Sequence, residues 1–124
     1  RAGRDANEAA LSLCGGEVVC ACLPFGDEDA ARGLGEFDLV LGSDIAYDPV
    51  SYEPLLRTLS AVGGDWRALL AISDRSDSLG EETFWNHCQD EGVPLECKYA
   101  ALVADAGEAP RRVTVYALRA RWWE

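Results

Sequence analysis

Short apolar runs alternate along the chain with segments in which apolar residues recur at helical spacing. Runs that are apolar at consecutive positions predict strands covered on both sides, whereas apolar residues three and four positions apart predict amphipathic helices. Strands are predicted over residues 17–23, 37–45, 68–72, 95–103 and 112–120, and helices over 5–13, 49–62 and 80–91.

Glycine and proline mark the ends of these elements. Gly15-Gly16 and Gly63-Gly64 follow two of the predicted helices, and Gly92 ends the third. Glycine just past a helix C-terminus readily adopts the left-handed backbone conformation that closes the last turn. Between the first two strands, residues 24–35 are predicted to be a loop with one helical turn over 29–32.

The order of the elements indicates an α/β fold. Strands that alternate with helices form a mostly parallel sheet with helices on both faces. The last two strands are joined by a short acidic segment that contains Gly107 and Pro110, which favours an antiparallel hairpin. Because the chain shows no internal repeat and no boundary, we predict that residues 1–124 belong to one domain.

Charge narrows the choice of partners. The 22 acidic residues outnumber the 11 basic ones, which gives a net charge of −11. Such a charge repels phosphate backbones and anionic lipid, so nucleic acid and membrane surfaces are poor partners and a basic protein segment is favoured. No apolar run approaches the roughly 18 residues that cross a membrane.

The cysteines indicate a reducing environment. An odd number of cysteines without framework spacing favours free thiols and a cytoplasmic protein. Cys20 and Cys22 fall on one face of a predicted strand, where they are expected to act as small buried hydrophobes. His87 is the only histidine, so no tetrahedral zinc site is predicted. The five cysteines are Cys14, Cys20, Cys22, Cys88 and Cys97.

Candidate chemistry is concentrated after the strand over 37–45. Ligands of open α/β sheets bind beyond the carboxyl ends of the strands, and Asp44 and Tyr47 follow this strand directly. A carboxylate there can hold an amine or a ribose hydroxyl, and a phenol ring can face a cationic chain. The alternative is that Asp44 or Asp48 only caps the next helix and Tyr47 only packs at its rim.

Two other candidates each have a structural alternative. Phe25, before Gly26, offers a stacking surface for an adenine ring or else belongs to the core. Residues 74–77 are either substrate contacts or a solvated loop.

His87 is predicted to be structural, because no nucleophile is placed near it and the chain has no G-x-S-x-G elbow. The chain also has neither a G-x-G-x-x-G nor a Walker loop.

Residues 37–47, Phe-Asp-Leu-Val-Leu-Gly-Ser-Asp-Ile-Ala-Tyr, resemble the D-x-x-Y block of the seven-strand protein-lysine methyltransferases, often called methyltransferase family 16. In that family a buried strand, a small residue, Asp, two apolar residues and Tyr precede a leucine-rich helix. Residues 49–62 are similar to that helix. Further similarities are the helix around Asn7, Leu23-Pro24-Phe25-Gly26 in place of Leu-x-Trp-Gly, the strand over 69–72, the helix start at 82–85 and the last two strands.

The resemblance implies a Rossmann-like domain that transfers a methyl group from S-adenosyl-L-methionine to a lysine side chain of a protein substrate. Asp44 would be the catalytic acid that orients the amine, and Tyr47 would line the substrate channel. Phe25 would contact the adenine side of the cofactor and Ser43 would be the small residue beside it. Phe25 keeps an aromatic face but lacks the indole N–H of the family's tryptophan.

The sequence departs from the family in one large respect. The family begins with a strand and Gly-rich loop that cradle the cofactor, followed by a strand ending in an acid for the ribose, and neither is present. Because the chain opens at Arg1 and contains no Met, we interpret it as the C-terminal part of such a domain. In the family's sheet, those two missing strands lie between the strands over 17–23 and 37–45. Their absence would leave open backbone edges there.

Two alternatives to a protein methyltransferase remain. One is a catalytically inactive Rossmann-like module that serves as a protein-interaction surface. The other is a methyltransferase acting on a small molecule or nucleotide. Asp44-Ile45-Ala46-Tyr47 disfavours the second, since amino-group nucleic-acid enzymes usually carry Asn or Asp followed by Pro-Pro and an aromatic residue.

Overall fold

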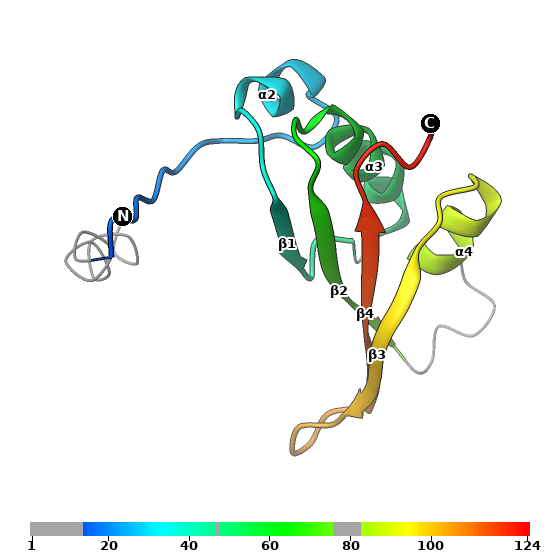
Figure 1. The fold of residues 1–124 in the computed structure, drawn as a ribbon. Coiled ribbons are helices and arrows are strands. Elements are labelled where there is room, and N and C mark those ends of the chain that lie inside the picture. The colour runs from blue at the N-terminus through cyan, green and yellow to red at the C-terminus, as the bar shows by residue number, and fades with distance from the viewer. Residues whose placement is uncertain (1–13, 47, 76–82) are drawn as a thin grey trace.

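The computed structural model describes residues 14–46, 48–75 and 83–124. Its centre is one four-stranded sheet in the order β1-β2-β4-β3 (Figure 1). The strands are β1 (Leu39–Ser43), β2 (Arg67–Arg75), β3 (Glu96–Val103) and β4 (Arg111–Arg119). The helices are α2 (Glu28–Gly33), the 3₁₀ turn η1 (Pro49–Ser51), α3 (Tyr52–Ala61) and α4 (Phe84–Asp90).

The sheet is mixed rather than mostly parallel in its pairing. β1 pairs with β2 in parallel, with Leu41 opposite Leu69. β4 pairs antiparallel with β2 on one side and with β3 on the other. β1, β2 and β3 therefore run in one direction and β4 runs against them. The α/β class and the C-terminal antiparallel hairpin are confirmed, whereas the predicted predominance of parallel pairs is wrong.

The helix that follows β1 forms where the sequence predicts it. Asp48 begins it, because its side chain accepts a hydrogen bond from Val50 N (3.2 Å). Pro49 occupies the first position of η1, where the absent N–H costs nothing. The apolar residues of α3 then lie on one face, which is buried at Tyr52, Leu55, Leu56 and Leu59.

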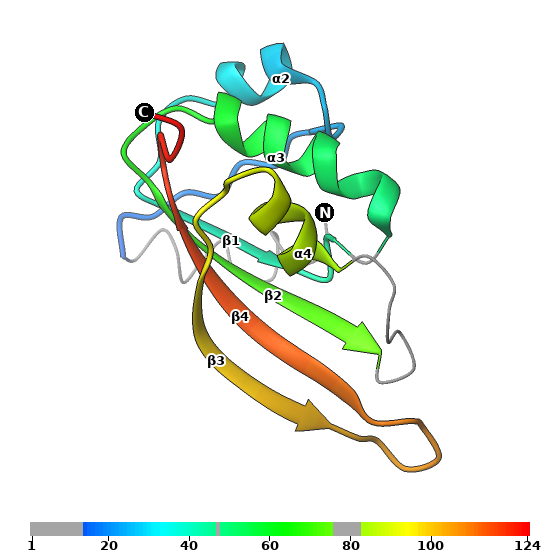
Figure 2. The same cartoon turned by 90° about the vertical axis from the view of Figure 1, so that its right-hand side faces the viewer.

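One side of the sheet carries the hydrophobic core. α3 and α4 lie over this side (Figure 2), and alternate residues of β2 and β4 point into it. Leu70, Ile72 and Leu118 are almost fully buried, and Phe84 and Cys88 of α4 are completely buried. Phe84 and Cys88 therefore form the inner face of α4. Trp66, also buried, donates from Nε1 to Val62 O (3.0 Å) and closes the end of α3 onto β2.

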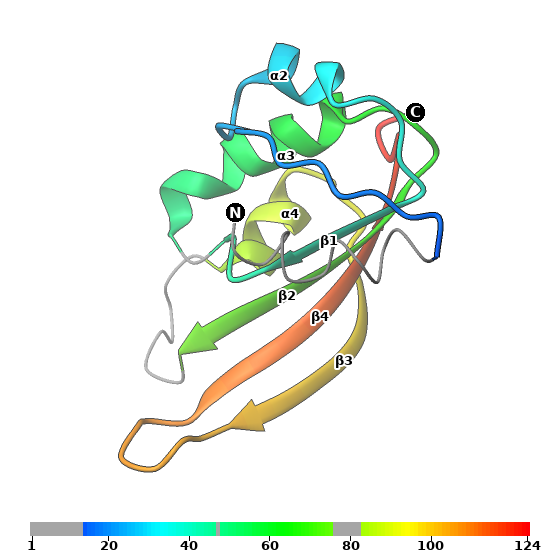
Figure 3. The ribbon, with the colours of Figure 1, turned by 90° about the vertical axis from the view of Figure 1, so that its left-hand side faces the viewer.

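Among the described residues, no helix lies on the opposite side of the sheet, the uncovered face (Figure 3). The predicted helix over residues 5–13 falls outside these residues, so helices on both faces stay a prediction. Leu39 is 54% exposed and Leu41 is 70% exposed. β1 is thus not buried on both faces as its continuous apolar run predicted. Its outward residues, every second one, face solvent.

The predicted strand over 17–23 is absent. These residues belong to no strand or helix, and Val19 is 75% exposed. Cys20 and Cys22, expected to be buried, are exposed. A strand is stable only when a neighbour satisfies its backbone N–H and C=O groups. The apolar side chains of this segment are therefore insufficient to form a strand without a paired edge beside it.

None of the helices that the structure describes is long and apolar enough to span a membrane.

Adjacent leucines of β2 test the one-sided core. Leu70 is completely buried against the helices, whereas Leu69 points the other way and is 39% exposed. We expect Leu70→Ala to lower the free energy of unfolding by about 2–5 kcal/mol. Leu69→Ala should lower it by less than about 1 kcal/mol. Denaturant unfolding of both variants would measure the difference, and equal losses would contradict a core confined to one face.

Candidate functional site

The carboxyl end of β1 has an unusual backbone at Asp44. Its φ is +54°, in the left-handed region that residues other than glycine rarely adopt. The Asp44 amide donates to Ala71 O of β2 (3.2 Å), which holds the residue beside the neighbouring strand. Asp44 is exposed. Backbone strain of this kind is concentrated at functional sites, but Arg121 shares it, with a φ of +56°. The position of Asp44 at a strand's carboxyl end is what makes it a candidate.

Gly42 makes the turn at Asp44 possible. Neighbouring side chains fill the space that a side chain at position 42 would occupy. An added Cβ would collide with the Ile45 side chain and lie 3.1 Å from Leu70 Cδ2. The chain after Ser43 therefore folds Ile45 back over the sheet. A larger residue at position 42 would prevent this, so the small residue in the strand is a steric requirement.

The structure separates the roles of the two neighbouring aspartates. Asp48 caps η1 through its side chain, and its carbonyl accepts from Ser51 Oγ (2.6 Å). Asp48 thus has the capping role that the sequence left open between Asp44 and Asp48. Tyr47, the predicted channel residue, lies outside the described residues.

A shallow hollow of about 410 Å³ lies beside Ser43 on the uncovered face. Its apolar walls come from neighbouring strands, and Ser43 places a hydroxyl-bearing residue at its rim. The hollow and Asp44 are therefore adjacent along β1. The lining residues are Leu41, Gly42, Ser43, Leu69, Ala71 and Val115.

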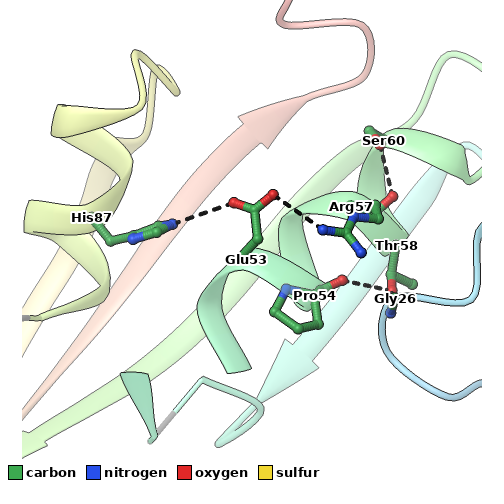
Figure 4. Close-up of polar contacts among 7 residues, drawn as sticks. All are labelled: Gly26, Glu53, Pro54, Arg57, Thr58, Ser60 and His87. Atoms are coloured by element: carbon green, nitrogen blue, oxygen red, sulfur yellow. Dashed lines mark hydrogen bonds and ion pairs between the residues drawn. The ribbon is translucent and has the colours of Figure 1, made fainter. Parts of the chain in front are cut away.

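Phe25 is attached to a different element. The Gly26 amide donates to Thr58 Oγ1 (2.8 Å), which in turn donates to Pro54 O (2.9 Å), so this turn is tied to α3 (Figure 4). Gly26 has a φ of +93°, which a glycine adopts without strain. Phe25 itself is 41% exposed. It is therefore not a core residue, and part of its surface is accessible.

These predicted site residues are only partly brought together. Ser43 and Asp44 are adjacent at the end of β1, whereas the hydrogen bonds of the Phe25 turn go to α3, the helix that follows the Asp44 loop. The side chains of Asp74 and Arg75, and residues 76–77, lie outside what the structure describes. The second candidate loop, after β2, therefore stays a prediction.

His87 occupies a structural position between α3 and α4. Its Nε2 lies 3.9 Å from Glu53 Oε2, and Glu53 Oε1 lies 3.6 Å from Arg57 Nη2 (Figure 4). The His87 ring also packs against Tyr52, with centroids 5.6 Å apart. These contacts agree with the prediction of a structural histidine.

Glu53, His87 and Glu91 are also the described residues that could hold a metal ion, since one donor atom from each lies within 4.8 Å of the others. Sequence reasoning did not single out this group. The only local signal for it is the four-residue spacing of His87 and Glu91, which places both on one side of a helix. Glu53, the third member, comes from α3 and already contacts Arg57.

No protein-family model matches this chain, and no curated protein matches it in sequence.

The cysteines allow a direct test of the core beside His87. Burial, with a smaller contribution from the Glu91 carboxylate, raises the pKa of Cys88 to about 12. Because only the thiolate is alkylated, Cys88 should stay unmodified by iodoacetamide in the native protein at pH 8 and at pH 10. The four exposed cysteines should all react. Mass spectrometry should find the fifth adduct only in denaturant; native labelling of Cys88 would contradict its burial.

Proposed function

We propose that this domain is a Rossmann-like S-adenosyl-L-methionine-dependent methyltransferase that acts on a lysine side chain of a protein. The observation that carries the proposal is the placement of Asp44. An exposed carboxylate follows a parallel strand directly, on a backbone held at positive φ by a bond to the next strand. Its position at a strand's carboxyl end is the usual place for ligands in α/β sheets.

The sheet supports the same assignment. β1 and β2 are parallel, and the chain ends in an antiparallel hairpin on that sheet. Both features agree with the resemblance of residues 37–47 to the D-x-x-Y block. The sequence motif and the strand order are independent observations, because the motif says nothing about how β4 pairs.

Methyl transfer to an amine requires mainly that the amine be neutral and held in line with the donor. S-Adenosyl-L-methionine, when bound, supplies the electrophilic methyl group. In our proposal the Asp44 carboxylate accepts a hydrogen bond from the target amine and orients its lone pair. Tyr47 lines the entry for the lysine chain. Ser43 and Phe25 are the residues that would contact the cofactor.

The described residues supply only one side of such a cofactor site. β1 has one neighbour, β2, so its other edge is open, and Leu41 beside it is largely exposed. A site for a charged cofactor needs walls on both sides to exclude water and fix its orientation. We therefore propose that the domain is active only when another segment pairs with this edge.

The binding prediction follows from that open edge. Titration of the 124-residue chain with S-adenosyl-L-methionine by calorimetry should give a Kd weaker than about 1 mM, or no heat. The product of the complete gene, titrated under the same conditions, is the comparison. Micromolar binding by the 124-residue chain would show that the open edge is not a defect of the cofactor site.

An inactive protein-interaction module is the second candidate. The observation that favours it is the uncovered apolar face, since large exposed apolar patches commonly mark interaction sites. Methylation by the complete gene product separates this reading from the first, because an inactive module transfers no methyl group.

The catalytic role of Asp44 can be tested with a matched aspartate. The complete gene product is incubated with S-adenosyl-L-methionine labelled in the methyl group and a cell extract. We expect Asp44→Ala to reduce labelling by at least about 100-fold, since it removes the group that orients the amine. Asp48→Ala removes only a helix cap, at a cost of about 1 kcal/mol in stability, and should keep most of the activity. Equal labelling by wild type and Asp44→Ala would remove Asp44 from the active site.

A further inference from the structure

The uncovered face of the sheet has an apolar middle. Residues of β2 alternate, with Ala68, Leu70 and Ile72 buried under the helices, so the residues between them point to the other side. The pairing register aligns these outward positions across the sheet. They form a continuous strip that includes the hollow beside Ser43. The strip consists of Leu39, Leu41, Leu69, Ala71, Val113 and Val115.

Arginines lie at both ends of this strip. Arg67 lies opposite Arg119 at one end, and Arg111, which is exposed, lies at the other end on the same side of β4 as Arg119. Like charges directly opposite each other on neighbouring strands oppose folding. The Arg67–Arg119 pair therefore stands out in a chain in which acids outnumber bases 22 to 11.

None of the described acidic residues neutralises the Arg67–Arg119 pair. In the part of the chain that the structure describes, no carboxylate forms an ion pair with either of these exposed arginines. Glu96, which lies opposite Ala117 on the same face, pairs with Lys98 at 2.7 Å. The charge of this pair is therefore available to an external anion.

From the apolar strip and its arginine ends, we infer that this face is the docking site for an amphipathic helix of a partner protein, apolar along one side and acidic at both ends. Arg111 and Arg119 are the first and last residues of β4, so the two cationic ends stand about 26 Å apart at roughly 3.3 Å per residue. A helix of about 17 residues spans that distance. The helix buries the strip, and its terminal carboxylates pair with the arginines.

A second copy of this chain fits the face poorly. A symmetric dimer through the strip would bring the cationic ends of two copies together and would join two bodies that each carry a charge of −11. An acidic helix removes the cationic repulsion instead of doubling it. The inference does not depend on the proposed methyl transfer, since it uses the outward apolar side chains and the arginines and needs neither the Asp44 carboxylate nor a bound cofactor.

The test uses the 124-residue chain and a fluorescent synthetic helix of about 17 residues, with a Leu/Ala face and Glu at both ends. Fluorescence anisotropy near physiological salt should give a Kd tighter than about 100 µM. Leu41→Glu should weaken binding at least about tenfold, because it buries an unpaired charge in the strip. Leu102→Glu is the matched control, because Leu102 has nearly the same exposed fraction as Leu41 (71% and 70%). Leu102 lies opposite Arg112, on the other side of the sheet. This substitution should therefore leave binding unchanged.

A charge swap tests the arginines themselves. Arg67→Glu combined with Arg119→Glu should weaken binding of the Glu-ended helix by about tenfold and should restore affinity for a helix with Lys at both ends. A proline at the centre of the peptide should abolish binding, because it breaks the helix.

Three results would overturn the inference. The first is no saturable binding below about 1 mM, or equal binding by wild type and Leu41→Glu. The second is undiminished binding of the proline peptide, which would indicate an extended strand on the edge of β1. The third is a peptide-free dimer in sedimentation that Leu41→Glu dissociates, which would assign the face to a second copy.

Discussion

The antiparallel pairing of β2 with β4 is the interaction on which the rest of this structure depends. It is the longest pairing in the sheet, running from Arg67 to Arg75, and it fixes which residues point toward the helices. Leu70 and Tyr116 lie opposite each other on the buried side. Because side chains alternate along a strand, a shift of one residue would turn the whole apolar set to solvent. α3 and α4 can cover this side only in the observed register.

The candidate site lies at the periphery of this core. β1 is held through a single neighbour, and Asp44 is held at its end by one backbone bond to Ala71. The strained backbone there is tolerated because Gly42 leaves room for Ile45 on the buried side. The position of Asp44 therefore depends on the core indirectly, through the position of β2.

The segment over 17–23 shows how local preference and tertiary context can conflict. Its residues are as apolar as those of β2, yet they form no strand and remain largely exposed. The two segments differ in their pairing. β2 has a strand on each side, whereas no described strand lies beside residues 17–23. Apolar surface alone does not compensate the backbone groups that a lone strand would leave without partners.

The sequence pattern alone was sufficient to predict the elements that depend on local contacts. The leucine spacing predicted α3, and the short acidic link predicted the β3–β4 hairpin, because each of these depends on neighbours close in the chain. It also located Asp44 at a strand end. Tertiary structure alone decided that β4 inserts beside β2, that the face bearing Leu41 is uncovered, and that Arg67 stands opposite Arg119. Those outcomes depend on which distant segments supply hydrogen bonds and apolar contacts, and a strand's own residues do not specify its neighbours.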